Sequence, residues 1–211
     1  MTPPPFPFRD ALRRLNTPAL AAFDRWLLPP GTLFGDLREW WSGLRPRRRP
    51  HEGVDLCWYR RQNGQAARVA PGTKVPALAP GRVVRVVGDF LSHSVFVAHR
   101  AEEAGGTLVV VYGHVEPALA TGEEIGEGGL LATLARPASG RVPPHLHLSL
   151  VLLPAGFSLA RLDWDLLHAS PAASFRDPLP LLGCPWEKVP APPAEASGTP
   201  ALPVDTRPGL Q

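Results

Sequence analysis

Two histidines stand two residues apart in the segment VPPHLHLSL, residues 142–150. In a β-strand, successive side chains point to opposite faces, so His145, His147 and Ser149 would share one face. The roots of neighbouring side chains on that face lie about 7 Å apart. One imidazole can then bind a metal while the next handles protons beside it. The pair therefore predicts a metal ligand next to a proton-transfer group.

A second cluster of possible ligands lies in RRRPHEGVDL, residues 47–56. His51 and Asp55 are four residues apart, a spacing that normally places two ligands on one helix face. Pro50 and Gly53 disfavour a helix here, so we expect a bend that leads into a strand. The pattern differs from the helical zinc motif HExxH, because its fifth residue is aspartate. A catalytic zinc usually takes three protein ligands, and this pair would complete the set begun by HLH.

A further histidine ends the segment TLVVVYGH, residues 107–114. Strand alternation places four of its side chains on one face: Leu108, Val110, Tyr112 and His114. If this strand lies beside the HLH strand, His114 reaches the same metal from the side. Each motif alone is weak, because a single histidine on a strand is more often structural than a ligand. Their joint occurrence in one small protein is what favours a metal site.

Short strands separated by tight turns must position these residues. Besides TLVVVYGH, three segments are β-branched or alternate at strand length: VVRVVG (83–88), SVFVAH (94–99) and HLHLSLVLL (145–153). Turns rich in glycine and proline separate the strands, and the 27 prolines disfavour long helices. No helical crossover lies between the strands, which is typical of antiparallel pairing. The sequence therefore predicts a mainly β fold, an antiparallel sheet or sandwich.

Residues 1–28 are interpreted as an N-terminal arm with a short helix. Thr17 followed by Pro18 is typical of a helix start, since the hydroxyl caps the first turn and proline suits the first position. Three apolar residues then share one side at helical spacing: Leu20, Phe23 and Leu27. We expect this helix to pack on the flank of the domain. An arm that covers the groove and keeps the site latent is a second hypothesis.

The remaining chain divides into a central domain, 29–183, and a tail, 184–211. The tail is rich in proline and has little to bury, so we expect it to be disordered. A length of 211 residues with 44% hydrophobic residues suits one globular domain with extensions. The net charge of +3 is too small to indicate nucleic-acid binding. The basic run RPRRR (45–49) is interpreted as a solvated loop, with attraction of an anionic polymer as the alternative.

Cys57 and Cys184 form no CxxC pair, which disfavours a cysteine-built zinc site. We interpret them as buried thiols, with one disulfide in an exported protein as the alternative. The N-terminal segment has charge and proline where a secretory signal has an apolar core, and no run is apolar enough to span a membrane. The sequence as written therefore predicts a soluble, cytoplasmic protein without a transmembrane segment.

Together these motifs resemble the lysostaphin-type, or LytM-type, zinc endopeptidases of bacterial cell walls. The most specific signatures are HxGxD, here His51, Gly53 and Asp55, and PHLH, here residues 144–147. An aromatic-x-His turn lies between them at residues 112–114. Weaker signatures, spread over most of the chain, follow the family's order: Phe34 and Gly35, Val75, Ala77, Gly81, Val83, Val86, His99, the turn GEEIGEGG, Asp177, Pro178 and Leu181.

The resemblance implies a fold of the duplicated-hybrid-motif kind that holds one Zn²⁺ per chain. By the resemblance, His51, Asp55 and His147 bind the zinc. His114 and His145 are then catalytic histidines that do not bind it. A zinc-activated water would attack a peptide bond, while one imidazole accepts the proton of the water and the other stabilises the oxyanion. The residues leave open which histidine does which.

Several features depart from the family pattern. ARPASGRV replaces the usual turn before HLH, Leu148 replaces an aromatic residue, and residues 154–176 form a longer stretch than in minimal members. We expect these changes to affect substrate specificity more than the zinc site. The remaining ring side chains are assigned elsewhere: Tyr112 to packing, with hydrogen-bond donation as the alternative, His99 to structure, and His93 and His168 to the surface.

The leading hypothesis is a monomeric zinc metalloendopeptidase that hydrolyses the peptide cross-bridges of peptidoglycan, which implies the cell envelope. One alternative is a non-catalytic binding or activator module of cell-wall hydrolysis. Such a module is expected to lack ligands or flanking histidines, and here all five are present. The other alternative is a purely structural zinc site, which needs four protein ligands. Cys57, two residues after Asp55, is the candidate for the fourth.

Overall fold

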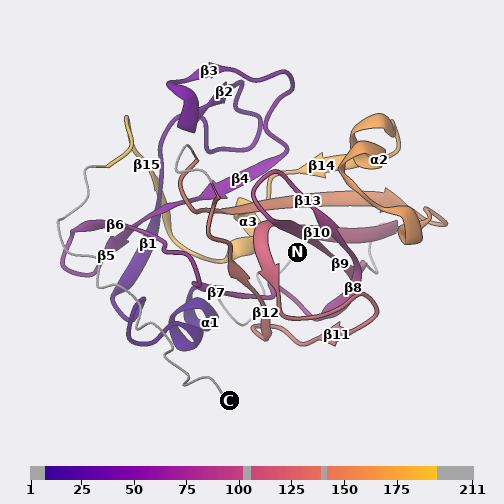
Figure 1. Ribbon diagram of the computed structural model, residues 1–211, viewed down its shortest axis with the longest axis horizontal. Coiled ribbons are helices and arrows are strands. Elements are labelled where there is room, and N and C mark those ends of the chain that lie inside the picture. Colours follow the sequence, from indigo (N-terminus) through magenta and orange to yellow (C-terminus); the bar gives the residue numbers. More distant parts are fainter. Residues whose placement is uncertain (1–7, 102–105, 139–141, 194–211) are drawn as a thin grey trace, which may run out of the picture.

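The computed structural model describes residues 8–101, 106–138 and 142–193 (Figure 1). Over these residues the chain is mainly β, with antiparallel sheets and a short helix near the N-terminus, as predicted. In chain order the elements are α1 (Phe8–Leu15), β1 (Phe23–Leu28), β2 (Arg38–Glu39), the 3₁₀ helix η1 (Trp40–Ser42), β3 (Arg45–Pro46), β4 (Gly53–Leu56), β5 (Trp58–Arg61), β6 (Ala66–Arg68), β7 (Lys74–Pro76), β8 (Gly81–Gly88), β9 (His93–Ala101), β10 (Gly106–Pro117), β11 (Glu124–Ile125), β12 (Leu130–Leu134), β13 (Leu146–Pro154), the 3₁₀ helix η2 (Leu159–Arg161), α2 (Trp164–Ala169), β14 (Ser174–Arg176), α3 (Leu179–Leu182) and β15 (Trp186–Lys188).

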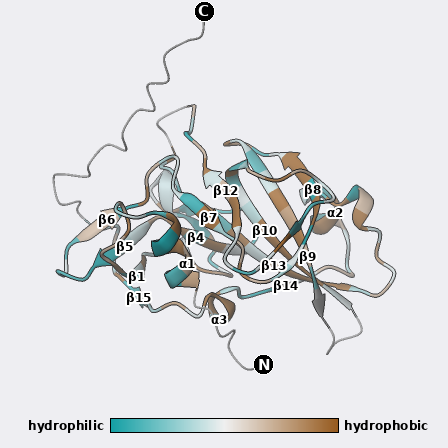
Figure 2. Cartoon of the chain, turned by 90° about the horizontal axis from the view of Figure 1, so that it is seen from below, coloured by the Kyte–Doolittle hydropathy of each residue, from teal (hydrophilic) through white to brown (hydrophobic). Residues whose placement is uncertain are grey.

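The largest sheet runs in the order β11-β8-β9-β10-β12-β7, and β13 joins it by pairing with β10, β4 and β14. β10 lies between β9 and β13 and is antiparallel to both. Hydrophobic colour runs along the strands of this sheet (Figure 2). Val110 and Val111 are neighbours in β10 and are both buried, which means that both faces of the sheet are covered here.

The strand register places four residues in one row across four strands. Asp55 on β4 is paired with His147 on β13, and His147 is paired with Gly113 on β10. Gly113 is in turn paired with Ser94 on β9. Directly opposite residues of antiparallel strands project from the same face. The row therefore defines one face of the sheet, termed the site face, and brings residues distant in sequence together on it.

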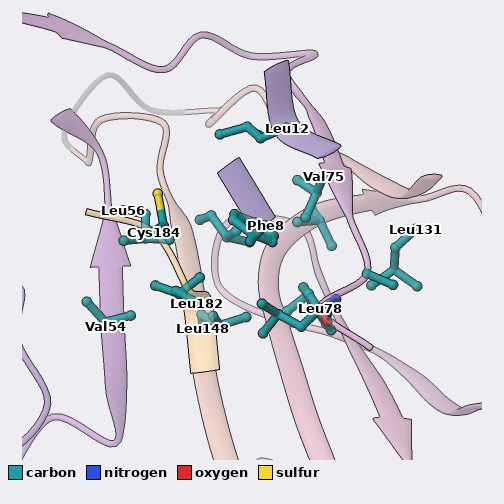
Figure 3. Close-up of a cluster of buried hydrophobic side chains, with 14 of the residues drawn as sticks. Phe8, Leu12, Val54, Leu56, Val75, Leu78, Leu131, Leu148, Leu182 and Cys184 are labelled. Atoms are coloured by element: carbon teal, nitrogen blue, oxygen red, sulfur yellow. Dashed lines mark hydrogen bonds between the residues drawn. The ribbon is translucent and has the colours of Figure 1, made fainter. Parts of the chain in front are cut away.

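The opposite face, termed the core face, packs into the main hydrophobic core. Leu146, Leu148 and Leu150 alternate with the site-face residues of β13 and join this core. Figure 3 shows Leu148 close to Leu182 of α3, with Phe8 of α1 in the same cluster. The alternation in HLHLSL thus gives β13 a polar side toward the site and an apolar side toward the core, as the sequence predicts.

The N-terminal helix lies earlier than the sequence predicts. α1 ends at Leu15, and the Thr17 hydroxyl donates a hydrogen bond of 2.9 Å to the Arg13 carbonyl. Thr17 therefore closes the end of a helix and does not begin one. Residues 23–28 form β1 instead of the predicted helix, and β1 pairs with β5 and β15. Because consecutive residues of β1 are buried, the strand lacks the alternation that would have revealed it.

The described part of the N-terminal arm is built into the fold. Phe8 and Leu12 of α1 are buried in the main core. The Asn16 amide donates to the carbonyls of Leu12 and Lys74, each at 2.8 Å, and so ties the end of α1 to β7. Removal of this arm would therefore remove core packing and a paired strand.

The tail begins as ordered chain. β15 pairs in parallel with β1 in the smaller sheet β15-β1-β5-β6. The prediction of disorder from residue 184 is therefore wrong for residues 186–188, while residues 194–211 lie outside the described residues. Cys57 and Cys184 are buried thiols that form no disulfide, as interpreted from the sequence. Among the helices of the described ranges, none is long and apolar enough to cross a membrane.

Candidate metal centre

The three predicted metal ligands converge where β4 lies beside β13. The ligand atoms of His51, Asp55 and His147 all lie within 4.8 Å of one another. His147 Nδ1 is 2.8 Å from Asp55 Oδ1. His51 Nε2 is 3.2 Å from Asp55 Oδ1 and 3.2 Å from His147 Nδ1. All three side chains are buried, so three polar atoms share one small space that opens away from the core.

The outer atom of each of these side chains lies within hydrogen-bond distance of a group outside the cluster. His51 Nδ1 meets the Leu33 carbonyl at 3.0 Å, Asp55 Oδ2 accepts from the Trp40 indole at 2.8 Å, and His147 Nε2 meets the Ser149 hydroxyl at 2.8 Å. Outer partners of this kind orient metal ligands and select the histidine tautomer. A carbonyl can only accept, so the proton of a neutral His51 belongs on Nδ1 and its Nε2 lone pair faces the other two ligands.

The donor set fits a zinc ion. Two imidazole nitrogens and one carboxylate oxygen are a common set for catalytic zinc. Donors bound at 2.0–2.1 Å to a tetrahedral ion lie about 3.3 Å apart, close to the separations of 2.8 and 3.2 Å seen here. Burial would raise the pKa of Asp55, but His51, His145 and His147 outweigh it and hold that pKa well below its usual value. The carboxylate is therefore available as an anionic ligand.

The HxGxD spacing has a local structural reason. A Cβ atom at Gly53 would lie 2.6 Å from Ser149 Oγ and 2.9 Å from His147 Nε2, so only glycine lets β4 pass this close to β13. The carbonyl of His51 accepts from the Gly35 N–H at 2.8 Å, which fixes the bend before the strand. Asp55 then re-enters the sheet opposite His147.

His145 lies directly beside the ligand cluster. Its Nε2 is 3.7 Å from Asp55 Oδ1 and is buried with no hydrogen-bond partner among the described residues. Its Nδ1 is 2.8 Å from the Pro143 carbonyl, which places the proton of the neutral ring on Nδ1. Burial lowers the pKa of His145 to about 4, against the opposing influence of Asp55. Near pH 7 the ring is therefore neutral and presents the Nε2 lone pair beside the ligands.

His114 reaches the site through a β-bulge. The pairing of β10 with β9 shifts register between Gly113 and Val115, and His114 has a φ of 66°. Strict alternation places His114 on the same face as Tyr112, but Tyr112 is buried in the core. That prediction of a shared face is wrong, because the bulge re-aims the side chain. The His114 ring lies 4.7 Å from the His145 ring between centroids.

A cavity of about 340 Å³ opens over this cluster. It is lined by Trp41, Arg47, Glu52, Asp55, Asp89, Phe90, His114, His145, His147, Trp164, Asp165 and His168. One wall follows the β2–β3 hairpin and the other is α2, which Figure 1 shows on the same side of β13. We term this cavity the cleft. Residues 8–28 contribute nothing to its lining, so the described part of the arm does not cover the site.

Two residues that sequence analysis placed on the surface or in a solvated loop line the cleft instead. His168 stacks on Trp164, with ring centroids 5.8 Å apart, and its Nε2 lies 3.8 Å from Glu52. Arg47 of the basic run lies 3.5 Å from Asp55 Oδ2 and is mostly buried. No local pattern marks either residue, because the fold brings two distant segments to the site: the loop after β3 for Arg47 and α2 for His168.

The other candidate residues have structural environments. Cys57 Sγ lies 3.5 Å from the Pro144 carbonyl and is not one of the clustered ligands. Tyr112 is fully buried, and its hydroxyl accepts from the Leu78 N–H at 2.8 Å. His99 is buried with Nδ1 2.8 Å from the Pro80 carbonyl. His93 is partly exposed, 3.9 Å from a carboxylate of β10. These positions agree with packing, structural and surface roles.

Comparison with known proteins gives matches only among solved structures. No protein-family model matches the chain, and neither does any curated protein. The catalytic domain of lysostaphin from Staphylococcus simulans matches at 18% identity and a TM-score of 0.43, over 84% of this chain and 98% of that one. A candidate M23 peptidase from Pseudomonas aeruginosa matches at 20% and 0.42, over 83% of this chain and 57% of that one. A zinc-containing peptidase from Vibrio cholerae matches at 16% and 0.40, over 67% and 40%.

The chain thus spans little more than half the length of the Pseudomonas protein and less than half of the Vibrio protein. At these levels of identity and TM-score, any function has to be supported by the chain's own side chains. In fold, this chain is similar to M23/LytM-type peptidases and to lysostaphin.

Proposed function

We propose that this protein is a zinc-dependent metalloendopeptidase that hydrolyses the peptide cross-bridges of peptidoglycan. The observation that carries the proposal is the convergence of His51 Nε2, Asp55 Oδ1 and His147 Nδ1 beside an open cleft that Asp55 and His147 line. Three protein ligands with an open side are typical of catalytic zinc, whereas structural zinc has four. The zinc-containing peptidase among the similar structures is consistent with this choice of metal.

The ligand residues have a defined part in this proposal. When bound, zinc lowers the pKa of its water toward neutrality and polarises the scissile carbonyl. His51 and His147 offer neutral nitrogens to the ion, and Asp55 offers one oxygen while its other oxygen stays bonded to Trp40. The outer hydrogen bonds keep these atoms in place before the ion arrives, which reduces the reorganisation that binding requires.

His145 is the proposed general base. Its Nδ1 proton is occupied by the Pro143 carbonyl, and its unpartnered Nε2 lies 3.7 Å from a ligand oxygen. A neutral imidazole in this position can take a proton from the attacking water and return it to the leaving amine. His114 closes the other side of the cleft and is the proposed stabiliser of the developing oxyanion.

The cleft suits a peptide substrate. Trp41, Phe90 and Trp164 give it apolar walls, while its base is polar. Phe90 is 66% exposed beside His114, so an aromatic surface is available to a ligand. Clefts with apolar walls and a few convergent polar groups are the usual form of ligand sites. Because the peptide bridges of a polymer must enter from solvent, an open groove is more suitable than an enclosed pocket.

Digestion of purified peptidoglycan tests the proposal. The full chain is incubated with the polymer in the presence of added zinc, then with a chelator, and the released fragments are analysed by mass spectrometry. We expect new amino termini within the cross-bridges only when zinc is present. The exposed-histidine variant His93→Ala serves as a matched control and should digest as well as the wild type. Zinc binding without any peptide cleavage would contradict the proposed activity and support a non-catalytic role.

A further inference from the structure

Asp89 lines the cleft, and both oxygens of its carboxylate accept hydrogen bonds. Its Oδ1 accepts from the N–H groups of Leu91 and Ser92 at 2.9 and 2.8 Å. These bonds anchor the carboxylate to its own turn between β8 and β9. The second oxygen, Oδ2, is left to face the neighbouring strand.

That second oxygen faces His114. Asp89 Oδ2 accepts from the His114 backbone N–H at 2.9 Å and lies 3.2 Å from His114 Nδ1. Nδ1 is buried and lacks an aligned hydrogen bond within the described residues, although the carboxylate is at contact distance. The same carboxylate therefore stabilises the left-handed backbone of the bulge and stands next to its side chain.

Two further side chains, Ser94 and Trp164, are hydrogen-bonded in series to Asp89. The Ser94 hydroxyl donates to Asp89 Oδ2 at 2.8 Å, and the Trp164 indole N–H meets the Ser94 oxygen at 3.0 Å. An indole nitrogen can only donate, so the Ser94 hydroxyl proton must point to Asp89. The two hydrogen bonds therefore run in one direction, with Trp164 donating to Ser94 and Ser94 donating to Asp89. An ionised Asp89 can only accept, so it favours a proton on His114 Nδ1.

We infer that Asp89 is a positioning residue for His114: it holds the Nδ1–H tautomer and so reserves Nε2 for the cleft. The inference rests on the proposed function, in which His114 acts on the substrate. It adds to that function a series of hydrogen bonds from Trp164 through Ser94 to Asp89. This series connects the position of His114 to α2, which forms one wall of the cleft. Burial works against charge on Asp89, but contacts with His114 and the turn outweigh it and keep the pKa of this carboxyl below its usual range.

Nitrogen-15 NMR of the full chain tests the inference directly. The zinc-loaded protein is labelled at its histidines and measured at pH 8, and His114 is assigned by loss of its signals in His114→Gln. We expect the wild-type ring to be neutral with its proton on Nδ1. A wild-type ring with its proton on Nε2 would overturn the inference without the need for any variant. This result does not depend on whether the protein cleaves peptidoglycan, so failure of the proposed function is distinguishable.

Variants then test whether the tautomer matters. In Asp89→Asn one acceptor oxygen becomes an NH2 donor. The remaining oxygen should stay on the two N–H groups of the turn, so that the NH2 faces His114. We therefore expect loss of the Nδ1–H tautomer and a fall in kcat of about 10- to 100-fold, with KM changed less than about twofold. Asp177→Asn is the matched control, because Asp177 likewise accepts from the N–H two residues further on, that of Leu179, and stays outside the cleft lining. It should leave kcat, KM and the His114 signals as in the wild type.

Zinc content and melting temperature are measured for each variant. If Asp89→Asn does not fold, Ser94→Ala replaces it, since this change keeps the carboxylate and removes one of its donors. We then expect a smaller shift in the same direction, visible as a mixture of the two His114 tautomers. An unchanged tautomer with unchanged kcat in a folded, zinc-loaded variant would overturn the inference. So would a fall in kcat that is explained entirely by lost zinc.

Discussion

Polar side chains are distributed differently on the two faces of the large sheet. On the core face such residues stand singly among apolar neighbours, as Tyr112 and His99 do, and each meets one backbone group. On the site face they cluster, and Asp55 has three imidazoles within 3.7 Å: His51, His145 and His147. A polar side chain that stands alone and meets one backbone group serves packing. Several ligand atoms that point at one another instead favour a bound cation between them. Clustering, and not histidine itself, therefore marks the site.

Replacement of a clustered ligand should have the largest effect. In His147→Ala only two of the three ligands remain, so we expect zinc binding at one ion per chain to fall below detection and peptide hydrolysis to stop. Isothermal titration with zinc at neutral pH measures the stoichiometry and affinity. A loss of affinity of only about 10- to 100-fold, the usual effect of an outer-shell change, would show that His147 is not a ligand.

Replacement of the neighbouring imidazole should separate binding from chemistry. His145→Ala keeps all three ligands but removes the proposed base, so we expect unchanged zinc stoichiometry and a fall in kcat of about 10²- to 10⁴-fold. The two quantities are measured on the same preparation by titration and by fragment release. Loss of zinc from this variant would show that His145 is needed to bind the metal, which contradicts its assignment as a residue that acts only in catalysis.

Replacement on the other face of β13 should act on stability alone. Leu148 is fully buried in the main core, and Leu148→Ala is expected to lower the free energy of unfolding by about 2–5 kcal/mol. The folded variant should still bind one zinc. Leu37→Ala is the control, because Leu37 is 62% exposed and a surface change of this kind costs at most about 0.5 kcal/mol. Urea unfolding of the metal-free proteins gives both values, and equal losses would show that the core face is misassigned.

The smallest expected effect concerns the histidine of the core face. Burial lowers the pKa of His99 below its ordinary 6.5. Below that pH the unfolded chain binds this proton more readily than the folded chain, so the stability present above about pH 6.5 is lost as the pH falls. We expect the melting temperature of metal-free wild type to drop between pH 7.5 and 5.5 by more than that of His99→Gln. Parallel melting curves for the two proteins would contradict this assignment.

Much of this arrangement is visible in the sequence because strand alternation is local. The period of HLHLSL places His147 and Ser149 on one face of β13 and the leucines on the other, and the structure has both. The bend before β4 was likewise expected, since Pro50 and Gly53 disfavour a helix. These features need only neighbouring residues, which is why single-sequence reasoning reaches them.

Features that depend on long-range pairing were not predicted. The bulge that turns His114 to the site face depends on pairing with β9 and on the carboxylate of Asp89, neither of which leaves a local pattern. β1 was taken for a helix because its burial comes from partners on both sides, β5 and β15. Arg47 reaches the cleft on the loop after β3, and His168 reaches it on α2. A tertiary partner can override a local preference in each of these cases.

X-ray absorption at the zinc edge of the zinc-loaded full chain tests the central claim most directly. If His51, Asp55 and His147 hold the ion, the first shell contains only nitrogen and oxygen at about 2.0–2.2 Å, with the outer scattering of two imidazoles. A sulfur scatterer at about 2.3 Å would instead identify a thiolate ligand such as Cys57. That result, or a first shell with fewer than two imidazoles, would contradict the three-ligand site.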